Sequence, residues 1–206
     1  MLKRLFIFTT ILFTSCKLVE KKQNFLIRDF NETDYSSGYK NIEGDTLIEF
    51  GKYPIIYTDT FRIIAIVGVK NDGIIGINRK EEKLFNVHVF DNWPDEISEG
   101  FFRIFIDKKY GFANMVGIQI KPKFEFVLAF SEGFAAVNIG GHSTDDYLEE
   151  HKIIKSGKWG FIDKKGHLVI ECKFDSILQS FKNGKAQVEL DNEIYYINTK
   201  GEKIQP

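Results

Sequence analysis

Apolar and polar residues alternate in short runs from residue 61 onwards, which is the pattern of β-strands that bury one face. The runs 101–106 (FFRIFI), 158–163 (KWGFID) and 193–198 (EIYYIN) show this alternation most clearly. Two of them lead into Asp-Lys-Lys-Gly and Asn-Thr-Lys-Gly, which place a turn-forming residue first and glycine where a positive φ is needed. A trace of helical periodicity is confined to 143–152. We therefore expect an all-β chain.

The strands recur as a repeat. Gly76, Gly111, Gly160 and Tyr195 occupy the centre of successive middle strands, and they are 35, 49 and 35 residues apart. Each unit is expected to contain two hairpins that share this middle strand, followed by an irregular return segment. The longer spacing places an insertion between residues 138 and 155. The expected units are about 61–97, 100–130, 133–181 and 184–206.

A glycine in the middle of a strand weakens the strand unless a close neighbour needs the space. We expect a bulky side chain of the neighbouring unit to fill the space at each glycine. The candidates are Phe90, Phe124 and Phe174. In the last unit Tyr195 would fill that space itself, because a terminal unit has no successor to fit against.

Segment 157–184 (GKWGFIDKKGHLVIECKFDSILQSFKNG) resembles the WG repeat family, and 108–133 resembles it almost as well. The resemblance covers about 140 residues and is weakest over 61–100, where Ile-Gly-Ile replaces the aromatic pair. It implies a repeat-built all-β protein, commonly bacterial and often exported, with no established enzymatic activity and with binding roles. We expect tandem β-hairpin repeats stacked as a solenoid-like array, the alternative being a closed propeller-like or barrel-like arrangement.

The first sixteen residues differ from the rest. Lys3 and Arg4 precede a largely apolar run at 5–13, which is too short to span a membrane and has the length of a signal-peptide core. The ending LFTSC resembles a bacterial lipobox, although Phe13 stands where leucine is common, and it makes Cys16 the expected site of lipid attachment. The alternative is a buried N-terminal strand with an ordinary cysteine. The predicted organisation is a signal peptide (1–15), a lipidated cysteine and tether (16–45), and a WG-type repeat domain (46–206).

Composition narrows the classes of partner. Hydrophobic residues make up 43% of the chain and aromatic residues 15%, enough for one folded domain. The net charge is −1, and no window concentrates Lys or Arg, so nucleic acid is not expected as a partner. Lipidation of Cys16 would leave Cys172 as the single thiol, so no intrachain disulfide is expected.

The insertion carries the main candidates for metal chemistry, with 140–152 as its acidic part. A metal-dependent hydrolase would need several of its side chains to converge, whereas the simpler interpretation is a solvated loop with a short acidic helix. The candidate ligands are His142, Asp145, Asp146, Glu149, Glu150 and His151. A second candidate is a nucleophilic pair of Cys172 and His88, at equivalent positions of two units, although such variable positions are more typical of tolerance.

The aromatic residues admit two interpretations. Tyr110, Trp159, Tyr195 and Tyr196 could line a sugar- or peptide-binding face, but aromatics at strand period are more often core. Trp93 lies outside the repeated strand positions and is the aromatic residue that we most expect on a surface.

These observations predict a non-enzymatic lipoprotein of the bacterial cell envelope, exported and anchored to a membrane, with the outer membrane as the expected address. Its repeats would act as a binding or interaction module for an unknown protein or glycan. No cofactor, metal site or catalytic residue is expected. The alternatives are the metal-dependent hydrolase and a purely structural envelope protein.

Overall fold

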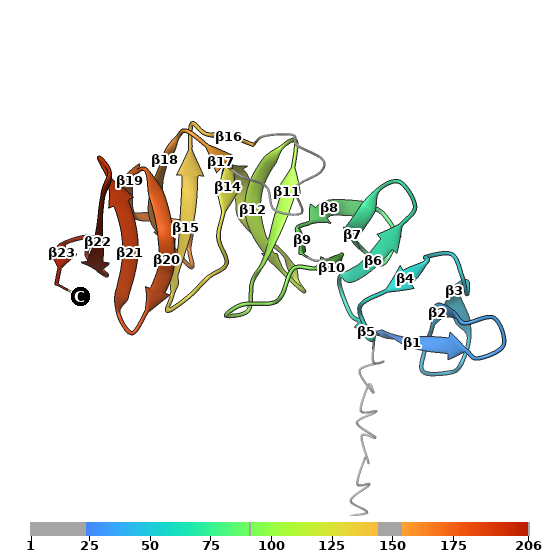
Figure 1. Cartoon of the computed structure of the whole chain (residues 1–206). Helices are drawn as coiled ribbons and strands as arrows, with labels where there is room; N and C mark the ends of the chain where they lie inside the picture. The colour runs from blue at the N-terminus through green and yellow to red at the C-terminus, as the bar shows by residue number, and fades with distance from the viewer. Residues whose placement is uncertain (1–23, 91, 144–153, 206) are drawn as a thin grey trace, which may run out of the picture.

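The computed structural model describes residues 24–90, 92–143 and 154–205, and these form strands, turns and loops without a helix. The expectation of an all-β fold is confirmed. None of the described segments could therefore cross a membrane as a long apolar helix. The strands follow one another from β1 at one end of the molecule to β22 and β23 at the other (Figure 1).

Four three-stranded antiparallel meanders confirm the predicted repeat, with first and middle strands close to the expected runs. We call them units 2 to 5. Unit 2 contains β6 (Ala65–Val69), β7 (Gly73–Ile77) and β8 (Lys83–Val87), and unit 3 contains β11 (Phe102–Ile106), β12 (Lys109–Asn114) and β13 (Gly117–Phe124). Unit 4 contains β15 (Phe134–Ile139), β18 (Lys158–Asp163) and β19 (Leu168–Phe174), and unit 5 contains β21 (Lys185–Leu190), β22 (Glu193–Asn198) and β23 (Lys203–Ile204).

A further unit precedes these four, so the interpretation of 16–45 as a tether is wrong for residues 26–40. Unit 1 contains β1 (Leu26–Asn31), β2 (Ser36–Lys40) and β3 (Thr46–Ile48), paired as an antiparallel meander. Its middle strand holds Gly38, and its second turn is closed by the Asn41 side chain, which accepts the N–H of Asp45 at 2.8 Å. The Asn198 side chain closes the same turn of unit 5. The polar composition of the segment had concealed strands whose outer faces are exposed.

The glycines of the middle strands are crowded by their own units. A Cβ on Gly160 would lie 2.4 Å from the Ile170 carbonyl oxygen, and one on Gly111 would lie 2.4 Å from that of Ile120. These carbonyls belong to the third strand, whose register shifts opposite the glycine and brings its backbone over the middle strand. The prediction that a ring from a neighbouring unit fills the space at each glycine is therefore wrong. At Gly76 the crowding group is the Phe85 ring of the same unit.

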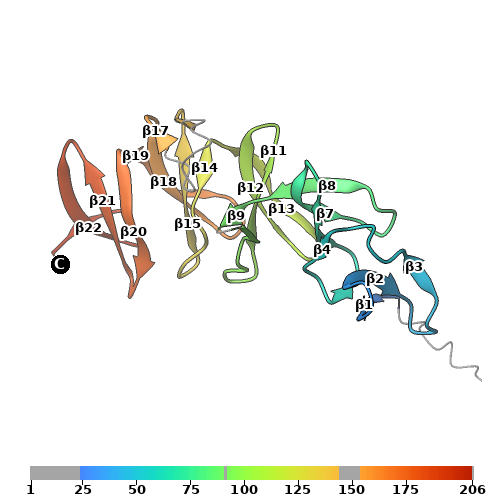
Figure 2. The same cartoon turned by 45° about the vertical axis from the view of Figure 1, so that its right-hand side comes forward.

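The return segments also differ from expectation, because they contain strands that pair with the first strand of the next unit. β14 (Phe126–Val127) pairs with β15, and β20 (Ser176–Lys182) pairs with β21. β4 (Ile55–Ile56) pairs with β6, while β5 (Thr60–Phe61) returns to β1. Units 2 and 3 join edge to edge through β8 and β11 in a seven-stranded sheet. Each sheet has two edge strands, so none closes into a barrel. Units 1 and 5 lie at opposite ends of the molecule in both views (Figure 1 and Figure 2), so the array is open rather than closed into a ring.

Hydrophobic clusters fill the spaces between successive units. One lies between units 1 and 2, a second is shared by units 2 and 3, and the third runs through units 3, 4 and 5. In the third cluster Phe181 contacts Phe134 and Phe161, with ring centroids 4.8 Å apart in both pairs. The units therefore bury their aromatic rings against one another, and none forms a separate core.

A ladder of polar contacts joins the turns that precede the first strands of units 3, 4 and 5. The Ser98 hydroxyl donates to the Phe130 carbonyl at 2.6 Å, and the Ser131 hydroxyl donates to the Phe181 carbonyl at the same distance. The Glu99 carboxylate accepts the N–H of Gly133 at 3.0 Å. One unit later, Glu132 accepts the N–H groups of Asn183 and Gly184, so each turn is capped by the unit before it.

Charged and polar residues close both ends of the array. On the outward face of unit 5, Gln187 and Glu189 stand where unit 4 has the buried Ala136 and Asn138. On the outward face of unit 1, the Lys40 ammonium lies 2.6 Å from the Asp29 carboxylate. Such polar capping is the usual way in which a repeat array avoids indefinite stacking.

Candidate binding surface

Several residues singled out by the sequence lie outside the described ranges. Cys16 precedes the first described residue, and the candidates of the insertion other than His142 fall within 144–153. Among the residues that the structure does describe, no three His, Cys, Asp or Glu side chains gather at a spacing suited to a metal ion. Metal binding by the insertion acids therefore stays a hypothesis from the sequence.

The base of the insertion is tightly built. β16 (His142–Ser143) pairs with β17 (Ile154–Lys155) after the chain leaves the β15–β18 hairpin. The fully buried Asn138 accepts the N–H of Gly141 at 3.1 Å, and a Cβ on Gly157 would lie 2.3 Å from that same nitrogen. Gly141 and Gly157 let the two arms of the insertion pass close to each other, so the insertion is fixed at its base. His142 is exposed and lies 3.1 Å from the Ser156 hydroxyl.

Cys172 and His88 have different neighbours. The Cys172 thiol is half-buried beside the Val137 carbonyl, and burial raises the pKa of the thiol, which disfavours the nucleophilic thiolate. The His88 ring packs edge-on against Tyr110 and Phe126. These surroundings are those of packed side chains rather than of an activated pair.

The repeated aromatic residues are mainly core, as expected. Tyr110 and Trp159 are buried in the cluster that runs through units 3 to 5, whereas Tyr195 and Tyr196 in the terminal unit are half-buried. Trp93, in contrast, is 66% exposed, which confirms its predicted place on the surface. A tryptophan exposed to this extent is uncommon, because its large apolar surface favours burial.

Trp93 belongs to a small aromatic corner. It lies on β10 (Trp93–Pro94), which pairs with β9 (Val89–Phe90). Its ring meets the Tyr57 ring edge-to-face, with centroids 5.9 Å apart and an interplanar angle of 72°. Partial burial raises the pKa of the Tyr57 phenol, so its hydroxyl is neutral at physiological pH and can donate a hydrogen bond.

Gly68 on β6 extends this corner into a ledge. A Cβ placed there would lie 3.5 Å from the Ile55 Cβ and 3.8 Å from the Tyr57 ring, which are ordinary contacts. Its backbone is not in the left-handed region, and β6 is hydrogen-bonded to β4 on one side and β7 on the other. We define the ledge as Ile55, Tyr57, Gly68 and Trp93.

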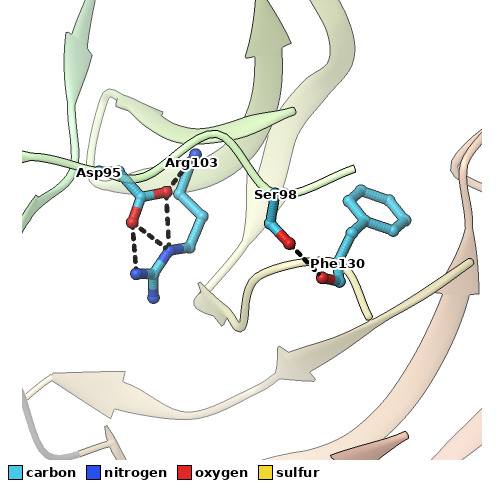
Figure 3. A network of polar contacts seen from close by, with 4 residues as sticks. All are labelled: Asp95, Ser98, Arg103 and Phe130. Carbon is cyan, nitrogen blue, oxygen red and sulfur yellow. Dashed lines mark hydrogen bonds and ion pairs between the residues drawn. The ribbon is translucent and has the colours of Figure 1, made fainter. Parts of the chain in front are cut away.

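A buried ion pair anchors the hairpin that carries Trp93 (Figure 3). The Asp95 carboxylate lies 2.5 Å from one terminal nitrogen of Arg103 and also accepts the Arg103 backbone N–H at 2.8 Å. The two side chains are only 4% and 13% exposed. The Asp95 N–H donates to the His88 carbonyl at 2.8 Å, which closes the loop below the hairpin. This network fixes the position of Trp93 relative to β11. It also pairs the negative charge of Asp95 with the positive charge of Arg103.

Sequence reasoning found Trp93 but missed its partners. Tyr57 lies in a segment without repeat signal, and Gly68 looks like any other strand glycine in the sequence. The spacing of eight residues between Asp95 and Arg103 gives no local sign of a contact, because β9, β10 and the following loop set the geometry. The insertion, which carries the candidate metal ligands, contributes no described residue to the ledge.

Comparison with known families supports the repeat assignment. The profile of the WG containing repeat matches residues 118–141 and 159–193. Each matched segment runs from a middle or third strand through a return strand into the first strand of the next unit. The chain therefore contains WG-type repeat segments between the third strand of unit 3 and the start of the middle strand of unit 5. A search of curated proteins found no match.

Proposed function

We propose that the chain is an exported lipoprotein, acylated on Cys16, whose WG-type repeats form a non-enzymatic binding module of the bacterial cell envelope. The observation that carries the binding role is the exposed Trp93 ledge, mounted by a buried ion pair on an array whose ends are closed by polar residues. The match to the WG containing repeat supports a repeat-based interaction module. The order of residues at 3–16 supports the address.

Affinity capture from native envelopes tests the binding role. The wild-type chain, with its lipid anchor intact, would be crosslinked to envelope components and compared with a Trp93→Ala variant. We expect one or more components to be retained by the wild type and lost from the variant. Equal capture by both chains would contradict a binding role for this surface.

Membrane fractionation tests the address separately. Cys16→Ser removes the acyl acceptor, and we expect the variant to leave the membrane fraction while the wild type stays in it. Cys172→Ser serves as the matched control, because it removes the other thiol and should not change the fractionation. Retention of Cys16→Ser in the membrane fraction would refute the anchor.

A further inference from the structure

Gly68 is the strand glycine that packing does not explain. A Cβ on Gly38, Gly76, Gly111 or Gly160 would come within 2.2 to 2.7 Å of a neighbouring atom, so each of these positions excludes a side chain. The space at Gly68 accepts a methyl group at 3.5 Å from its nearest neighbour. A glycine within a strand costs about 0.5–1 kcal/mol relative to alanine. The pairing of β6 with β4 and β7 has no register shift, so a bulge does not explain the glycine, and close approach of a ligand or of another chain is a remaining reason.

The position of Gly68 connects this observation to the aromatic corner. Its missing side chain would contact the Tyr57 ring, and the Tyr57 ring is in contact with Trp93. The exposed Ile55 lies opposite Gly68 in the β4–β6 pair. A flat backbone floor therefore lies beside two aromatic rings that stand nearly perpendicular to each other.

The chemistry of the ledge points to an uncharged ligand. None of its four residues is ionised at neutral pH, and Arg103 neutralises the Asp95 carboxylate. A proline-rich peptide docks on aromatic rings, whereas an extended peptide joins a sheet through main-chain hydrogen bonds to a free strand edge. The backbone at Gly68 offers no such edge, because β6 is paired on both sides. At Gly68, recognition therefore relies on the faces of the rings and on the backbone surface beside them.

From these observations we propose that the ledge of Ile55, Tyr57, Gly68 and Trp93 is a binding site for a neutral saccharide chain. A sugar ring places its C–H face on the electron-rich face of the indole, and the next part of the chain passes over Gly68. The Tyr57 hydroxyl is the available donor for a sugar oxygen. This inference rests on the proposed function and specifies the ligand class of the same surface.

Tryptophan fluorescence of the full chain provides the test. The two tryptophans are Trp93, which is 66% exposed, and Trp159, which is 9% exposed, so acrylamide quenches chiefly the emission of Trp93. The probes are a panel of soluble neutral oligosaccharides of glucose and of N-acetylglucosamine, together with neutral oligosaccharides released from purified envelopes. We expect at least one probe to protect the emission from acrylamide. Trp93→Phe should abolish the protected signal.

Calorimetry with the protecting saccharide then separates binding from folding. We expect Trp93→Ala to raise Kd by at least about tenfold and Gly68→Ala by about threefold or more, with the melting temperature of Gly68→Ala not lowered. Val116→Ala is the matched control, because Val116 is 61% exposed and lies outside the ledge. Its Kd should equal that of the wild type.

Three results would overturn the proposal. The first is a panel in which no saccharide protects Trp93. The second is binding that Trp93→Ala and Gly68→Ala leave unchanged. The third is protection of Trp93 by a captured envelope protein but by no saccharide, which would leave the proposed binding role intact and reject the ligand class. Saccharide binding by a chain that captures nothing from envelopes would support this site while contradicting the envelope role.

Discussion

Gly160→Ala tests whether the third strand really lies against the middle strand. The added methyl carbon would stand 2.4 Å from the Ile170 carbonyl oxygen and 2.7 Å from the Cys172 nitrogen, both backbone atoms of β19. Ordinary carbon contacts begin near 3.4 Å, so β19 would have to move away by roughly 1 Å. Backbone atoms in a paired strand cannot turn aside as a flexible side chain can.

The expected cost follows from the displaced strand. Overpacking costs about 1–3 kcal/mol, and a ladder hydrogen bond lost from the β18–β19 pair adds about 1 kcal/mol. The smaller conformational freedom of unfolded alanine returns about 0.4–1 kcal/mol. The net loss is about 1–3.5 kcal/mol, with a central value of about 2.5 kcal/mol. For a chain of this length that lowers the melting temperature by about 5–10 °C.

The assay is thermal unfolding followed by circular dichroism, with Gly68→Ala as the matched control. Both changes add one methyl group to a strand glycine, but Gly68 has ordinary contact distances and Gly160 has not. We expect Gly68→Ala to leave the melting temperature unchanged or raised. Equal losses in the two variants, or a Gly160→Ala chain that melts within 1 °C of wild type, would refute the reasoning.

Four further results follow from the packing and the ion pairs. Ser131→Ala removes the hydroxyl that donates to the Phe181 carbonyl, and a loss of about 1 kcal/mol is expected, measured as faster hydrogen exchange in unit 5. Asp95→Ala leaves the Arg103 guanidinium buried without its partner and should cost about 3–5 kcal/mol by chemical denaturation. The exposed Asp72→Ala should cost at most about 1 kcal/mol, and a similar loss in both variants would contradict a buried role for Asp95. Replacing residues 140–157 by Asn-Gly should preserve the fold, as measured by circular dichroism. Ile139 and Lys158 are paired in the same way as Ile106 and Lys109, which a two-residue turn connects. A chain that unfolds would contradict this expectation. The Lys158 ammonium lowers the pKa of the Asp175 carboxyl in the folded chain, so this ion pair stabilises the fold above the ordinary Asp pKa of 3.8, and the stabilisation is lost as the pH falls below that value. Asp175→Asn should therefore flatten the acid dependence of the melting temperature between pH 7 and pH 3. An unchanged slope would contradict this role of the pair.

Much of the fold could be predicted because each repeat unit buries one face of its strands and therefore shows the same alternation of apolar and polar residues. Strands β18 and β22 coincide with the alternating runs 158–163 and 193–198, and Gly166 adopts the positive φ that its turn predicts. The first unit was missed because its strands have exposed outer faces and a polar composition. The crowding at Gly160 could not be foreseen either, since it arises from a register shift within the unit. The spacing in the sequence indicates that the middle strand requires a glycine, but it does not show which atoms occupy the space that a side chain would take.

The surface was less predictable than the fold. Trp93 could be assigned to the outside because it interrupts the repeat pattern. Its contact with Tyr57 joins the residue that follows β4 to a residue of β10, and neither of these two-residue strands has a periodic signal. The Asp95 and Arg103 side chains meet inside the protein, where a charge pattern in the sequence does not reveal burial.

The polar ladder gives assembly of the array a direction. Glu99 and Glu132 hold the turns at Gly133 and Asn183 in the left-handed region, and each carboxylate precedes in the chain the turn that it caps. In a polypeptide synthesised N-terminus first, the glutamate that precedes unit 3 or unit 4 therefore emerges before the turn that it caps. In unit 5, Lys182 and Asn183 stand in place of this serine and glutamate, so its turn offers neither the hydroxyl nor the carboxylate of the ladder.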